Sequence, residues 1–169
     1  MKIFITIIIS LFSVSNSQDL NMNLENINPN SSSYSEWIGP SDFGNIINIY
    51  YFGHQNWGTC SSRFGQLNEL YNNLNPSVSE SVQIIGVGKS QYSNANNNWI
   101  STNQLPFTMD QSPSHETWNE WEANQRDLYF IDRYGNFNCK INITSGFNVN
   151  AVNEKIQTLI YHSTPNLII

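Results

Sequence analysis

The chain has 169 residues, a formal net charge of −6, and 39% hydrophobic and 13% aromatic residues. This length fits a single domain with a sizeable core, and the hydrophobic content excludes a disordered chain. The acidic balance argues against a surface for nucleic acid or an anionic membrane, because such surfaces need clustered Lys and Arg.

The first 17 residues have the pattern of a secretory signal peptide. Lys2 supplies the positive start, Ile3–Phe12 is a short apolar core, and Ser15 and Ser17 are the small residues before a cut at Gln18. The same pattern also fits an N-terminal anchor or a buried strand. No other segment approaches the roughly 20 apolar residues that a membrane helix needs. We therefore expect residues 1–17 to be removed and the mature protein to be secreted, with no membrane partner.

In an exported protein the two cysteines could form a disulfide and two sequence motifs could carry glycans. In an oxidising compartment Cys60 and Cys139 could form a disulfide, provided that their Cα atoms lie within about 7 Å. For Cys139 the favoured interpretation is structural burial. Asn30 and Asn142 begin Asn-x-Ser/Thr motifs and are candidate sites for a glycan, so a glycoprotein is expected.

The chain after the signal divides into a polar segment and a domain. Residues 18–40 are rich in Asn, Ser and Pro and predict a loose N-terminal segment. The predicted domain spans residues 41–163. It opens with a buried strand over 45–53, because that run is apolar and β-branched or aromatic nearly throughout. A helix from residue 60 to about 74 and a second buried strand at 81–88 complete a βαβ unit.

The second half of the domain predicts four further elements. These are a short strand in 104–111, an amphipathic helix at 115–123, a β-hairpin over 127–142 and a closing helix at 149–161. A βαβ unit followed by a strand, a hairpin and a helix is the order of a thioredoxin-like α/β fold, with a mixed central sheet covered by helices on both faces.

Cys60 stands where the first buried strand gives way to a helix. Open α/β sheets bind their ligands at the carboxyl ends of strands. The N–H groups and the dipole at a helix N-terminus favour a reactive thiolate, so Cys60 is the candidate nucleophile. His54 and Arg63 lie close in sequence and could support it. The alternative is a buried cysteine that acts as a small hydrophobic residue.

From Asn45 to Tyr161 the chain resembles the N-terminal thioredoxin-like domain of selenoprotein P. The resemblance rests on six landmarks: the strand leading into NWGTC, the helix ending at Leu74, IIGVGKSQ, LPFTMDQ, the short Trp-bearing segment that follows it, and LYFIDRYGNFNCKI. It implies a redox motif of selenocysteine-x-x-cysteine, with Cys60 at the cysteine position and Trp57 at the selenocysteine position. It also implies that Pro106 is a cis proline beside the site.

Trp57 is the main departure from that family, because an indole cannot enter a cycle of chalcogen exchange. Selenocysteine is encoded by UGA, and some genetic codes read UGA as tryptophan. Selenium therefore enters only if Trp57 is a mistranslated selenocysteine, and no other cofactor or metal is expected.

Two functions remain open at this point. The first is thiol redox chemistry through Cys60, either disulfide exchange with an unidentified thiol or disulfide partner or reduction of a peroxide. The second is a non-catalytic extracellular binding module that kept the fold and lost the pair. The aromatic residues Trp99, Trp118 and Trp121 could serve an interface, although such residues more often belong to a core.

Overall fold

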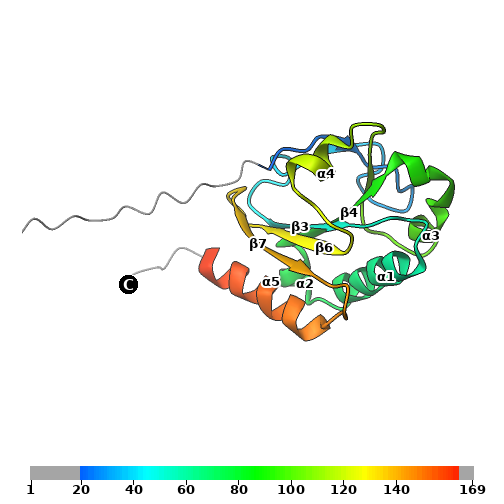
Figure 1. Ribbon diagram of the computed structural model, residues 1–169. Helices are drawn as coiled ribbons and strands as arrows, with labels where there is room; N and C mark the ends of the chain where they lie inside the picture. The colour runs from blue at the N-terminus through cyan, green and yellow to red at the C-terminus, as the bar shows by residue number, and fades with distance from the viewer. Residues whose placement is uncertain (1–19, 164–169) are drawn as a thin grey trace, which may run out of the picture.

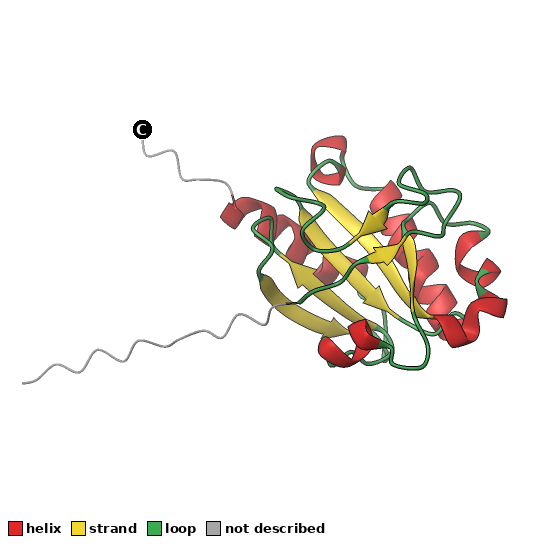
Figure 2. Ribbon diagram, turned by 90° about the horizontal axis from the view of Figure 1, so that it is seen from above, coloured by secondary structure: helices red, strands yellow, loops and turns green. Residues whose placement is uncertain are grey.

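A mixed five-stranded sheet forms the centre of the computed structural model, which describes residues 20–163. Its strands are β3 (Ile47–Phe52), β4 (Val82–Lys89), β5 (Phe107–Asp110), β6 (Asp127–Ile131) and β7 (Phe137–Asn142). They lie in the order β5-β4-β3-β6-β7 and cross the molecule side by side in the view from above (Figure 2). β4 is parallel to β3 and β5, whereas β6 is antiparallel to β3 and β7.

Helices cover both faces of this sheet. They are α1 (Gly58–Asn72), α2 (Pro76–Ser79), the 3-10 helix η1 (Ser90–Ala95), α3 (Asn97–Ile100), α4 (Glu116–Glu120) and α5 (Val149–Ser163). Helices α1 and α5 lie under one face, and α4 lies over the other (Figure 1). The predicted thioredoxin-like order of elements is therefore confirmed, with α2, η1 and α3 as short additions.

The central strand β3 explains why the sequence shows an unbroken apolar run. All six of its residues are buried. Because successive side chains of a strand point to opposite faces, Ile49 and Tyr51 pack with α1 and α5, whereas Tyr50 and Phe52 pack with α4. A strand covered on both faces cannot alternate apolar and polar residues, and this one does not.

The prediction of a loose segment at residues 18–40 is wrong for the part that the structure describes. Residues 20–40 carry a second, two-stranded sheet of β1 (Leu24–Glu25) and β2 (Trp37–Ile38). Leu20, Met22 and Ile38 are buried with the core residues on the α4 face. The segment is therefore part of the domain.

Buried asparagines explain how so polar a segment packs. Asn26 and Asn28 are fully buried, and their side chains bond to backbone groups that would otherwise lack partners. The Asn26 side-chain oxygen accepts a hydrogen bond from the Phe107 N–H (3.0 Å), and the Asn28 amide donates to the carbonyls of Asn103 (2.9 Å) and Leu105 (2.8 Å). These asparagines, which composition assigns to a loop, thus connect the N-terminal segment to the backbone of residues 103–107.

The sequence predicts a signal peptide at the N-terminus and no membrane-spanning segment after it. The predicted signal peptide, residues 1–17, lies outside the described residues. Within residues 20–163, every helix is too short or too polar to cross a bilayer.

Candidate functional site

The two motif positions at the N-terminus of α1 differ in their exposure to solvent. β3 ends at Phe52, and α1 begins at Gly58 after a short loop. Trp57 is the N-cap residue, has extended backbone angles, and is 51% exposed. Cys60, in the first turn of the helix, is 0% exposed. Position 57 is therefore open to a partner, whereas the sulfur of the motif is buried.

Tyr51 lies directly under Cys60. Its hydroxyl donates a hydrogen bond to the Cys60 carbonyl at 3.0 Å, and its ring stacks on Phe64. The pKa of Tyr51 is raised far above its ordinary value of 10.0, first by burial and then by the charge of the Cys60 side chain and a hydrogen bond with it. Nearby Arg126 and Arg63 oppose this rise. The tyrosine therefore stays protonated and remains a hydrogen-bond donor.

Arg126 is the site residue that the sequence did not indicate. Its Nη1 lies 3.6 Å from the Cys60 Sγ, and its Nε donates to the Thr144 hydroxyl at 3.0 Å. Arg126 and Cys60 are 66 positions apart, and nothing in the local sequence connects them. Arg63, which the sequence suggested as a support, directs its Nε to the Ile143 carbonyl (3.2 Å) and its Nη1 to Gln66 (2.8 Å).

His54, the second suggested support, belongs to an aromatic group beside position 57. Its ring lies 4.6 Å from Tyr92 and 6.3 Å from Trp57, measured between centroids. Its pKa is lowered from 6.5 to about 4, chiefly by burial and then by the charges of Lys89 and other nearby cations. The Gln125 side-chain amide forms a hydrogen bond with Nδ1 of this ring. His54 is therefore neutral at physiological pH.

Gln55 fixes the loop between β3 and α1. It is fully buried, and its amide donates to the Lys89 carbonyl (2.9 Å) and to the Asn96 side chain (3.1 Å). Its backbone carbonyl accepts from the Asn98 amide at 2.9 Å. These bonds connect the loop to the last residue of β4 and to the segment that follows it, so the loop that leads to position 57 is held by a partly buried polar network.

The expectation of a cis proline at Pro106 is wrong. Among the described residues the cis peptide bond is Ser112–Pro113, and Leu105–Pro106 is trans. Hydrogen bonds on both sides hold this stretch of backbone: the Leu105 carbonyl accepts from Asn28, and the Pro106 carbonyl accepts from the Gly86 N–H at 2.9 Å.

The remaining candidates lie apart from the helix terminus. Both cysteines are free, so the structure has no Cys60–Cys139 bridge, and Cys139 is half-buried on β7 opposite Phe130. The tryptophans Trp99, Trp118 and Trp121 are 4% exposed or less, and they belong to the core.

The two glycosylation motifs differ in their hydrogen bonds. Both asparagines are exposed, and the Asn30 side-chain amide donates a hydrogen bond to the Ile100 carbonyl (2.8 Å). The Asn142 amide donates to the Gln125 carbonyl (3.0 Å) and to Asp127 (2.7 Å), so both of its hydrogens are engaged.

Comparison with known proteins bears on the fold. No family model matches the chain, and no curated protein sequence matches it. A thiol-disulfide isomerase from Corynebacterium glutamicum superimposes with a TM-score of 0.69 at 13% identity, over 89% of this chain and 99% of that one. The chain has the thioredoxin fold.

Two further structures extend the likeness. A secreted Mycobacterium tuberculosis disulfide oxidoreductase homologous to E. coli DsbE has a TM-score of 0.62 at 12% identity, over 83% of this chain and 98% of that one. Yeast Sco1 with copper bound has a TM-score of 0.66 at 13% identity, over 89% and 92%. At these identities the likeness establishes the thioredoxin fold, and the finer resemblance to selenoprotein P stays a prediction. In residues 20–163 no three His, Cys, Asp or Glu side chains gather as a metal site requires.

Proposed function

We propose that the N-terminus of α1 is a thiol-redox site and that Cys60 carries its chemistry. One observation supports this most: Cys60 lies in the first turn of α1, at the carboxyl end of the central strand, where the thioredoxin fold places its ligands and a helix dipole favours an anion. Structural neighbours that are described as thiol-disulfide enzymes agree with it.

The reaction takes one of two balanced forms. In disulfide exchange, the Cys60 thiolate attacks a disulfide R–S–S–R, forms Cys60–S–S–R and releases R–S⁻. In peroxide reduction, it attacks ROOH, forms the sulfenic acid and releases RO⁻. A first thiol then forms a mixed disulfide with Cys60 and releases water, and a second thiol releases the Cys60 thiol and a disulfide. Because Sγ is buried, the helix terminus must first open locally, and small substrates gain access more readily than protein disulfides.

Turnover by matched variants tests this proposal. The wild type, Cys60→Ser and Cys139→Ser are compared as catalysts of peroxide reduction and of disulfide reduction, with a dithiol as reductant. We expect Cys60→Ser to lose the activity and Cys139→Ser to keep it. Equal rates in the wild type and Cys60→Ser would contradict the proposal.

A selenium form of the same site depends on position 57. A selenolate at this exposed N-cap position would attack first, and the Cys60 thiolate beneath it would then displace the substrate and close a selenium–sulfur bridge. Reading the Trp57 codon tests this form. A UGA codon supports a selenocysteine that was translated as tryptophan, and a UGG codon eliminates it.

The exposure of the two motif residues also favours a second candidate function. Trp57 is 51% exposed and lies near His54 and Tyr92, whereas the Cys60 sulfur is out of reach. A non-catalytic binding module would use this aromatic surface and leave Cys60 as packing. Such a module predicts equal, background rates for the wild type and Cys60→Ser, together with loss of partner binding in Trp57→Ala.

A further inference from the structure

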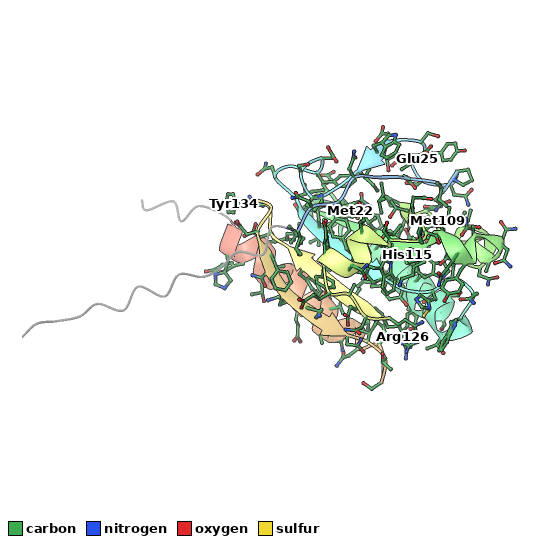
Figure 3. The ribbon with its side chains drawn as sticks, turned by 45° about the horizontal axis from the view of Figure 1, so that its top comes forward. Met22, Glu25, Met109, His115, Arg126 and Tyr134 are labelled. Carbon is green, nitrogen blue, oxygen red and sulfur yellow. The ribbon has the colours of Figure 1, made fainter. Side chains whose placement is uncertain are left out.

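Arg126 is held firmly at the end of the sheet that faces α1. Its N–H donates to the Phe52 carbonyl at 2.7 Å, and its carbonyl accepts from the Ile143 N–H at 2.9 Å. Its φ of 68° lies in the left-handed region, which residues other than glycine rarely adopt. In Figure 3 the residue lies where the loop before β6 meets the end of β7, beside α1. Hydrogen bonds at both its N–H and its carbonyl thus fix the backbone from which the Arg126 side chain extends.

The guanidinium connects the Cys60 sulfur to the segment after β7. One nitrogen, Nη1, faces Sγ at 3.6 Å, and another, Nε, is anchored by Thr144 at 3.0 Å. A guanidinium is planar and rigid, so anchoring one nitrogen sets the direction of the others. The Tyr51 hydroxyl beside Cys60 is neutral, and the hydrogen bonds of Arg63 go to Ile143 and Gln66. Arg126 is the cation with a hydrogen bond to Sγ.

We propose that Arg126 is a positioning residue that holds the Cys60 sulfur and compensates its charge during redox exchange. This inference rests on the function proposed for Cys60. When a thiolate R′–S⁻ resolves the mixed disulfide Cys60–S–S–R, the S–S bond breaks, its electron pair returns to the Cys60 sulfur, and R–S–S–R′ leaves. A fixed cation beside the sulfur favours this charged form, as cations do at reactive cysteines.

Single-turnover kinetics with a neutral aromatic disulfide, dithiodipyridine, test the proposal. All variants carry Cys139→Ser, so that Cys60 alone reports. We expect Arg126→Gln to slow the native reaction about tenfold, Arg126→Lys to restore it to within about threefold, and Arg63→Gln to stay within about twofold. In concentrated urea, where the site is absent, all variants should react at one rate.

The outcomes distinguish a failure of the role of Arg126 from a failure of the redox function proposed for Cys60. If the Cys139→Ser parent does not react at Cys60 in the native state, the proposed redox function fails. If the parent reacts and Arg126→Gln reacts as fast, or if Arg126→Lys is as slow as Arg126→Gln, the role of Arg126 alone is refuted. Thr144→Val gives a second test if Arg126→Gln does not fold. It frees the guanidinium and should slow the reaction about threefold, and an unchanged rate would overturn the proposal.

Discussion

Replacing Asn28 with alanine should detach the N-terminal segment from the sheet edge. Asn28 is fully buried and makes three hydrogen bonds through its side chain, to the carbonyls of Asn103 and Leu105 and from the N–H of Asn30. Each such bond contributes about 1 kcal/mol net, and a buried group left without a partner costs about 1–3 kcal/mol. The expected loss is about 3 kcal/mol in the free energy of unfolding, a large part of the roughly 5–15 kcal/mol of a typical domain.

Urea denaturation followed by tryptophan fluorescence measures this loss. Asn23→Ala is the matched control, because Asn23 is an exposed asparagine of the same segment. Asn28→Asp tests whether the amide donor or the shape of the side chain matters. Aspartate has the size of asparagine but puts a carboxylate against the carbonyl oxygens of Asn103 and Leu105, so it should destabilise the fold at least as much as alanine. A loss below about 1 kcal/mol in Asn28→Ala would refute the view that this residue fastens the segment.

Three further predictions follow from packing, charge and hydrogen bonds. Gly86→Ala should destabilise the fold by about 1–3 kcal/mol, because its new Cβ would lie 2.7 Å from the buried ring of Phe64. Gly65→Ala in α1 is the control: its Cβ meets nothing within 4 Å, and it should stabilise the fold by about 0.5–1 kcal/mol. Thermal unfolding of the two variants measures this difference. His54 has a folded pKa of about 4 against an ordinary 6.5, so the unfolded state takes up the proton first and stability falls as pH drops from 6.5 to 4. Allowing for solvent screening of this half-buried ring, we expect a loss of about 1–2 kcal/mol that disappears in His54→Gln, and an unchanged pH dependence in that variant would contradict it. If the protein is exported, peptide mapping should find a glycan on Asn30 and none on Asn142. The Asn142 amide donates both of its hydrogens within the fold, whereas the Asn30 amide donates one hydrogen bond, to Ile100. A glycan on Asn142 would contradict this prediction.

Strong local patterns explain which elements the sequence revealed. The run at 45–53 became β3, and the hairpin predicted over 127–142 became β6 and β7. These elements are determined by side-chain periodicity and turn chemistry, both of which are readable within a short window. The position of Cys60 in the first turn of α1 followed from the same reasoning.

Long-range contacts explain what the sequence concealed. Asn28 looks like a loop residue until its partners at 103 and 105 are known, and composition does not show them. Arg126 contacts Cys60 across 66 positions through a left-handed backbone conformation that no motif marks. Pro106 was expected to be cis by family resemblance alone, and the Leu105–Pro106 bond has the ordinary trans form.

The most direct test of the central claim maps where the native protein reacts. The wild type is treated briefly with dithiodipyridine, quenched in acid, digested and examined by mass spectrometry. We predict a mixed disulfide on Cys60 whose formation is abolished in Cys60→Ser and retained in Cys139→Ser. A label confined to Cys139, with Cys60 unmodified until the protein is unfolded, would contradict a redox role for the N-terminus of α1.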